Sequence, residues 1–227
     1  MTGHLNDHEQ LEALKKWWWS NGINLLTVLI IVGGGWFAWH YWQNRSSEQA
    51  EQASIVYMAM LDAVSVWERN ASDEAANQVS SHAEMLKKLS PGSQYGRYAA
   101  LTIARLAAAD GDYDNATAEL EWALAEAEDD AMRALVRLRL AGVEFARGDH
   151  DAALAWLDNA HPKAFHALYA ELKGDILAAQ GNNEAARIAY QAAMEGLQAG
   201  DMQVQALLQL KINEMKPGTG AAGEGEA

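Results

Sequence analysis

A cluster of acidic residues in the middle of the chain has the spacing of a calcium-binding loop. Asp110, Asp112 and Asp114 alternate along the sequence, and Glu121 follows where such loops carry their bidentate ligand. A calcium loop needs glycine for its sharp bend at the position where Asn115 stands. Because the same turn recurs later in the chain without the full calcium-loop spacing, we interpret it as a turn between helices and predict no metal site there.

The remaining candidates for chemistry are also isolated. His161 and His166 could supply imidazole ligands, but the sequence offers no third ligand near them. Residues 218–223 fit the glycine pattern of dinucleotide-binding turns, yet they follow no predicted strand and open no predicted helix. The chain has no cysteine, which excludes disulfides, thiolate metal sites and cysteine nucleophiles. We therefore predict a protein that is not an enzyme and has no catalytic, cofactor-binding or metal-binding residues.

A recurring turn indicates that the chain is built from helical repeats. Segments 111–116, 148–153 and 181–186 each begin with glycine, continue with Asp or Asn, and contain alanine. Their glycines are 37 and then 33 residues apart, close to the period of the tetratricopeptide repeat, a helix–turn–helix unit. Glycine favours the left-handed conformation that ends a helix, and the following Asp or Asn can cap the next helix. The copies are degenerate, because the early tryptophan and the terminal proline of that repeat are missing.

Apolar residues at helical spacing extend this array on both sides. We expect further helices over 47–69, from about 72 to 89, and from 201 to about 215. The composition is rich in Ala, Leu, Glu and Gln, which favour helices. The sequence therefore predicts an all-α protein with a tetratricopeptide-like helical solenoid over residues 43–216. Residues 217–227 have little to bury, and we predict that they are disordered.

A long stretch near the N-terminus contains no Lys, Arg, Asp or Glu. It runs from residue 17 to 44, and its core of residues 23–42 would span about 30 Å as a helix, the thickness of a bilayer's hydrocarbon layer. Tryptophan and tyrosine gather at both ends, as they do at headgroup level. We predict a single transmembrane helix over 21–42 after a short cytoplasmic segment, 1–20. A cleaved signal peptide or a buried core helix are the competing interpretations, and the bulky rings at the end of the stretch disfavour cleavage.

Basic residues on the two sides of the predicted span indicate its orientation. Lys15 and Lys16 precede it and Arg45 alone follows it, and cytoplasmic flanks carry the excess of positive charge. We therefore expect a cytoplasmic N-terminus and a repeat domain on the other side of the membrane. Gly34 and Ala38 form a small-xxx-small pair that is typical of closely packed membrane helices. The net charge of −14 argues against nucleic-acid partners, because phosphates would be repelled.

The first helix of each repeat should line the concave face of the solenoid. Counting back from the turns, we predict a mixed apolar groove with one guanidinium that binds an extended or unfolded segment of another protein. The candidate groove residues are Tyr98, Leu101, Arg105, Leu135, Leu138, Phe145 and Leu168. The competing interpretation is that several of these side chains are buried between helices.

Several short motifs together resemble the ancillary SecYEG translocon subunits of Gram-negative bacteria. They are LEALKK at 11–16, NG at 21–22, WHYW at 39–42, ASIVY at 53–57 and YG at 95–96. The resemblance runs from residue 7 to about residue 213, and the glycine-rich tail lies beyond it.

The resemblance implies a single-pass inner-membrane protein with a periplasmic repeat domain. The partners that it implies are the SecYEG translocon, exported polypeptides, membrane lipid and a membrane-anchored periplasmic chaperone of the peptidyl-prolyl isomerase type. The function that it implies is the passage of newly exported polypeptides to the periplasmic chaperone network, with no cofactor. The alternative is an architectural adaptor or regulatory scaffold of the envelope that binds folded partners without chaperone activity.

Overall fold

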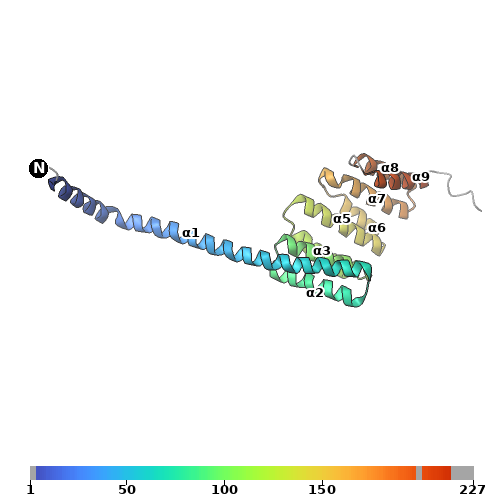
Figure 1. Ribbon diagram of the computed structural model, residues 1–227. Helices are drawn as coiled ribbons and strands as arrows, with labels where there is room; N and C mark the ends of the chain where they lie inside the picture. The colour runs from blue at the N-terminus through green and yellow to red at the C-terminus, as the bar shows by residue number, and fades with distance from the viewer. Residues whose placement is uncertain (1–3, 198–200, 216–227) are drawn as a thin grey trace, which may run out of the picture. The chain divides into compact units, whose positions relative to one another are not determined.

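The computed structural model describes residues 4–197 and 201–215, and every regular element in this part of the chain is a helix (Figure 1). The elements are α1 (His4–Arg69), α2 (Asp73–Leu89), α3 (Gln94–Ala109), α4 (Tyr113–Ala125), α5 (Asp130–Arg147), α6 (His150–Leu157), the 3-10 turn η1 (Lys163–Phe165), α7 (His166–Ala179), α8 (Asn183–Glu195) and α9 (Met202–Glu214). The chain divides into two compact units, and the boundary lies between Gln52 and Ala53. The all-α prediction is confirmed, and the tail predicted to be disordered lies outside the described residues.

Helix α1 is continuous over 66 residues, so the helix predicted over 47–69 is its C-terminal part and not a separate element. The sequence contains no proline or glycine between Trp36 and Arg69, and nothing there interrupts the backbone hydrogen bonds of a helix. Among the residues that the structure describes, no helix combines the length and the apolar character needed to cross a membrane.

The part of α1 that belongs to the first unit exposes many large apolar side chains. They include Leu11, Trp17, Trp18, Trp19, Ile31, Val32, Trp36, Phe37, Trp39 and Tyr41. At Gly34 no heavy atom lies within 4 Å of the place where a Cβ would stand, which leaves that surface open to a close neighbour. The side chain of Ala38, the other member of the predicted pair, is outside the described part of the chain.

The three predicted turns have a common geometry in the second unit. Gly111, Gly148 and Gly181 have φ values of 77°, 91° and 77°, the left-handed region that glycine enters without a steric cost. The residue after each glycine forms hydrogen bonds with both the preceding and the following helix. The backbone N–H of Asp112 donates to Ala107 O at 2.8 Å and closes α3, while its carboxylate accepts from the N–H of Asn115 at 3.2 Å and caps α4. The prediction of repeated helix–turn–helix units is confirmed.

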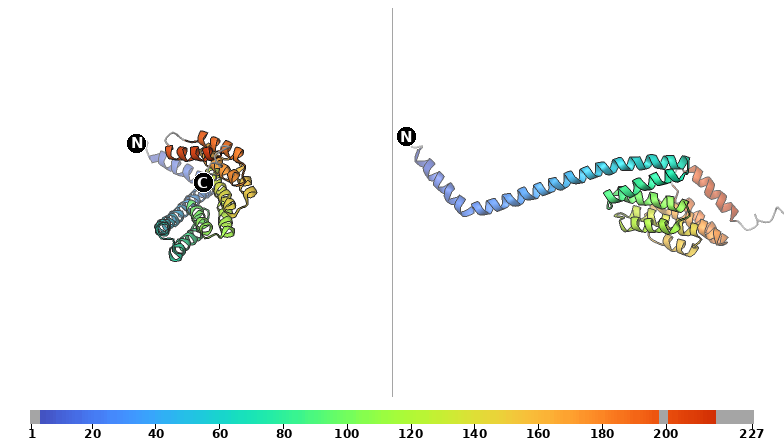
Figure 2. Two further views of the ribbon diagram at one scale, coloured as in Figure 1. Left: turned by 90° about the vertical axis from the view of Figure 1, so that its right-hand side faces the viewer. Right: turned by 90° about the horizontal axis from the view of Figure 1, so that it is seen from below.

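Helices of the second unit pack against their neighbours in chain order, and seen end-on they follow one another along an arc (Figure 2). Small residues let each pair approach closely. The alanines predicted at equivalent points, Ala104, Ala116, Ala141, Ala153 and Ala186, are all buried. Four clusters of buried side chains follow one another along the array, as expected when each repeat buries its apolar face against the next.

Glycine is required at one helix contact, between α7 and α8. A Cβ at Gly174 would lie 2.5 Å from Cδ1 and 3.0 Å from Cζ of Tyr190. This ring is only 2% exposed, and its hydroxyl donates to Asp175 Oδ1 at 2.8 Å, so it cannot swing aside. We expect Gly174→Ala to lower the free energy of unfolding by about 2 kcal/mol, because the overlap outweighs the helix propensity that alanine adds.

Urea denaturation followed by circular dichroism measures this change. Gly142→Ala is the matched control, because nothing lies within 4 Å of a Cβ at Gly142 in α5. That variant should gain up to about 1 kcal/mol from helix propensity alone. Equal gains from both substitutions would contradict the close contact at Gly174.

Candidate protein-binding groove

An open groove of about 730 Å³ crosses the first helices of successive pairs in the second unit. Each helix contributes a row of side chains at helical spacing, which places them on one face. The rows include Tyr57, Leu61 and Val64 on α1, Leu101, Arg105 and Ala108 on α3, Leu135, Arg139, Gly142 and Ala146 on α5, and Leu168, Leu172 and Asp175 on α7. The volume is in the range of concave, mostly apolar ligand sites in proteins.

The structure brings six of the seven predicted groove residues together. Tyr98, Leu101, Arg105, Leu135, Leu138 and Leu168 all line the groove. Leu168 is 49% exposed, and Tyr98, Leu101, Leu135 and Leu138 are half-buried. Several of them also pack on the core beneath, so the predicted groove and the competing interpretation both describe part of their surroundings.

Phe145 is the exception, and its placement in the groove was wrong. Its side chain packs on the core cluster shared by α5, α6 and α7, and its ring centroid lies 5.6 Å from that of His150. Phe145 follows Leu138 by seven residues, which turn a helix by about 700°, about 20° less than two full turns. Because Leu138 is already at the edge of the groove, those 20° place the Phe145 side chain outside it. The face of α5 that lines the groove follows Leu135, Arg139, Gly142 and Ala146. The helical period of 3.6 residues could have identified these three further positions.

Two guanidinium groups lie at the α3 and α5 side of the groove. Arg105 is exposed, its Nη1 lies 2.8 Å from Glu68 Oε1, and its guanidinium stands 5.3 Å from the ring centroid of Trp67. Arg139 is also exposed. The stacking on Trp67 holds the Arg105 head group beside the apolar floor, where it can meet a polar group of a bound chain.

Two carboxylates lie at the α7 side, and the last helix supplies their counter-charge. Lys211 of α9 donates from Nζ to Asp175 Oδ1 at 2.8 Å and to Glu171 Oε1 at 2.9 Å. The hydroxyl of Tyr190 donates to the same Asp175 oxygen. The network joins α7, α8 and α9 and leaves this end of the groove acidic but largely neutralised.

This network predicts a loss of stability at alkaline pH. Burial and the hydrogen bond to Asp175 raise the pKa of Tyr190. Burial lowers the pKa of Lys211, but its hydrogen bonds to Asp175 and Glu171 outweigh burial and the pKa is raised. A group whose pKa is raised by folding stabilises the protein below its unfolded pKa and loses that effect as pH rises through the folded pKa. The melting temperature should therefore fall above about pH 10.

Thermal melts between pH 8 and pH 11.5 measure this effect. Tyr190→Phe removes one of the two titrating groups, so its melting temperature should fall less steeply above pH 10 than that of the parent protein. Tyr113→Phe, which changes a half-buried tyrosine outside the network, should keep the parent's pH dependence. Parallel curves for all three proteins would show that the network does not control alkaline stability.

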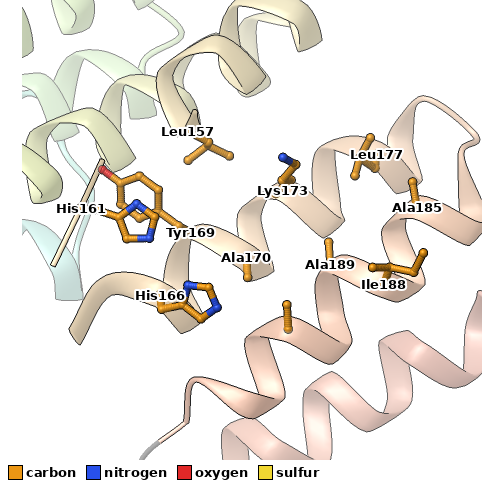
Figure 3. Close-up of a pocket in the computed structure, with 11 residues that line it drawn as sticks. Leu157, His161, His166, Tyr169, Ala170, Lys173, Leu177, Ala185, Ile188 and Ala189 are labelled. Atoms are coloured by element: carbon orange, nitrogen blue, oxygen red, sulfur yellow. The ribbon is translucent and has the colours of Figure 1, made fainter. Parts of the chain in front are cut away.

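A second, smaller hollow of about 440 Å³ lies among the end of α6, α7 and α8 (Figure 3). His161 and Tyr169 lie side by side at one end of it, with ring centroids 4.0 Å apart and nearly parallel planes. His161 and His166 are 6.1 Å apart by the same measure. In the residues that the structure describes, no group of three His, Cys, Asp or Glu side chains could hold a metal ion.

Three of the acidic residues with calcium-loop spacing have structural roles at the turn. Asp110 is the C-cap of α3 and Asp112 is the N-cap of α4. Asp114 lies 3.0 Å from the guanidinium of Arg147 in the next helix pair. Their spacing follows from the turn between helices. The glycine pattern at 218–223 lies outside the described residues.

Glycine turns, small residues between paired helices and a groove across the first helices define a tetratricopeptide-type solenoid. The family described as tetratricopeptide repeat-like domain matches residues 15–217, nearly the whole chain. This match covers the groove and every described helix of the second unit.

Relatives of similar length identify the family more closely. The ancillary SecYEG translocon subunit of Haemophilus influenzae is 31% identical over 95% of this chain and 100% of its own length. The protein of the same name from Aggregatibacter actinomycetemcomitans is also 31% identical, with the same coverage. That of Escherichia coli is 29% identical over 92% of this chain and 97% of its own. The chain therefore belongs to the family of ancillary SecYEG translocon subunits, as its motifs predicted.

Proposed function

We propose that this chain is a membrane-anchored accessory subunit of the SecYEG translocon whose groove binds newly exported polypeptides. The observation that carries the proposal is one continuous groove with apolar rows from α1, α3, α5 and α7, in a chain whose relatives are named translocon subunits. Open apolar surface that is not covered by the chain itself favours contact with another protein. An extended segment can follow the groove across several repeats, as chains do on concave solenoid faces.

The chemistry of the groove favours binding of many different unfolded polypeptides, its clients, over binding of a single folded partner. Its walls combine apolar side chains with two arginines and two carboxylates, so segments of varied sequence find both apolar and polar contacts. Binding of this kind is broad and weak, which suits the transfer of a passing chain. We propose that the exported polypeptide then passes to the periplasmic chaperone network, including a membrane-anchored chaperone of the peptidyl-prolyl isomerase type.

The proposed anchor is the part of α1 over residues 21–42, with a cytoplasmic N-terminus and the repeat domain in the periplasm. Its support is the absence of Lys, Arg, Asp and Glu from residue 17 to 44, and the large apolar side chains that α1 exposes there. A helix with such a surface favours contact with a partner or with lipid. The assignment requires that alkaline carbonate leaves the protein in the membrane pellet and that detergent releases it. Release by carbonate alone would contradict a span.

Client binding is tested by adding the full-length protein, in lipid nanodiscs, to a chemically unfolded polypeptide as it is diluted from denaturant. Light scattering should decrease in proportion to the amount of protein, and empty nanodiscs should have no effect. Normal aggregation of the client, with the protein still co-purifying with the translocon, would favour the alternative of an adaptor or regulatory scaffold for folded partners.

A further inference from the structure

Helix α6 is shorter than its counterparts in the adjacent repeats. It has 8 residues, whereas α4 and α8 have 13 each. All three start directly after an equivalent Asp or Asn cap, so the difference lies at the C-terminal end. The five positions that would complete α6 are residues 158–162. Pro162 is the last of them, and proline disfavours helix both at its own position and at the residue before it.

The smaller hollow begins where α6 ends. Leu157, the last residue of α6, forms one wall, and Ile188 and Ala189 of α8 form the opposite one (Figure 3). Five more residues of helix would have added about 7.5 Å to α6 at this place. We call the hollow the α6 slot. It lies beside the end of α6, where a longer α6 would have continued.

The α6 slot lies on the other side of α7 from the groove. Leu168 and Leu172 of α7 face the groove, while Tyr169, Lys173 and Leu177 line the slot. At 100° per residue the mean directions of the two sets differ by about 120° around the helix axis. An occupant of the slot would therefore leave the groove free.

The charge of the α6 slot differs from that of the protein around it. The chain has a net charge of −14, yet the ionisable residues that line the slot are His161, His166 and Lys173. Lys173 Nζ lies 3.6 Å from Asp158 Oδ1, and the lysine side chain is 47% exposed, so its charge remains available to solvent and partners. The other lining residues are apolar apart from the Tyr169 hydroxyl, which donates to Ala134 O at 2.8 Å.

We propose that the α6 slot is a second docking site, which takes one or two helical turns of a partner protein with an apolar anchor and an acidic residue beside it. The helical form follows from the place of the slot, where the adjacent repeats seat the last turn of their own second helix. The apolar anchor would cover Ile188, which is 56% exposed, and the carboxylate would meet Lys173 and the two histidines. The domain could then hold a client in the groove and a fixed partner in the slot at the same time.

Fluorescence anisotropy with full-length protein in nanodiscs tests this site. The probes are three labelled helical peptides with the same leucine anchors, flanked by Glu, Gln or Lys. The Glu peptide should bind most tightly, about tenfold better than the Lys peptide at low salt. Ile188→Glu should weaken binding of the Glu peptide by at least about tenfold, because the substitution places a charge against the apolar anchor. Lys173→Gln should reduce the preference for Glu over Lys.

Controls separate this site from the groove. Met85→Glu introduces the same charge at an exposed apolar residue of α2 that lines neither site, and it should leave affinity unchanged. Leu168→Glu alters only the groove, so it should also leave the Glu peptide bound, whatever becomes of client binding. Equal affinities for the three peptides, or no effect of Ile188→Glu, would overturn the proposal. If the slot bound dodecanoate in a way that depends on Ile188 and bound none of the peptides, it would be a lipid site. That result would also overturn the proposal.

Discussion

Replacing Leu61 and Leu168 together by glutamate should remove about 99% of the affinity for unfolded polypeptides. Both residues line the groove, and they are 41% and 49% exposed, so a client can cover them. Because about half of each side chain is already covered, burying the rest of the two leucines is worth about 1.5–3 kcal/mol, or about tenfold to a hundredfold in affinity. Two carboxylates in their place would add the cost of removing charge from water.

The substituted residues are exposed enough for the fold to tolerate the change. Circular dichroism and the melting temperature of the double variant should match those of the parent. A matched control carries Ile55→Glu and Met85→Glu, which are also exposed apolar positions of the second unit but do not line the groove. Client affinity is measured by anisotropy with a labelled unfolded polypeptide. Full affinity in the folded groove variant would exclude this groove as the client site.

Replacing Arg97 by methionine should destabilise the protein by about 3 kcal/mol. Arg97 is 7% exposed, and its Nη1 donates to Gly92 O and Glu126 O, both at 3.1 Å. These bonds join the loop before α3 to the loop after α4. Methionine would fill the space but remove both hydrogen bonds, and hydrogen bonds from a charged group are worth about 1.5–3 kcal/mol each. The pair with Glu128 adds little, because that carboxylate is 76% exposed.

Urea denaturation measures this effect in the full-length protein. Arg97→Lys keeps the charge but has no planar fork, so it should lose about half as much as the methionine variant. Lys88→Met is the control, since Lys88 is 80% exposed and its pair with Glu84 spans 3.9 Å. A methionine variant as stable as the control would mean that Arg97 does not join the two loops.

The turns and their spacing could be predicted because local chemistry determines them. A turn made of a glycine with positive φ and a residue that caps the next helix depends only on the types of three or four neighbouring residues. The same holds for the alanines between paired helices, which recur at the period of the repeat. Six groove positions were also accessible, since a helical stripe places them once the turns are known.

Other features depend on contacts that no local pattern records. Arg97 looks like a surface residue in sequence, and only the meeting of two loops buries it. Phe145 was misplaced because a small error in helical phase accumulates over two turns. The α6 slot arises from a shortened helix, whose sequence signal is Pro162. A hollow follows from that signal only when α7 and α8 are in place.

Photo-crosslinking during export tests the central claim most directly. A photoreactive amino acid at Leu61 or Leu168 places the probe in the groove, and one at Met85 places it on an exposed apolar site elsewhere. With a secretory polypeptide stalled in the translocon, we predict crosslinks to that polypeptide from both groove positions and none from Met85. Equal crosslinking from all three positions, or none from the groove while the protein remains bound to the translocon, would contradict the account.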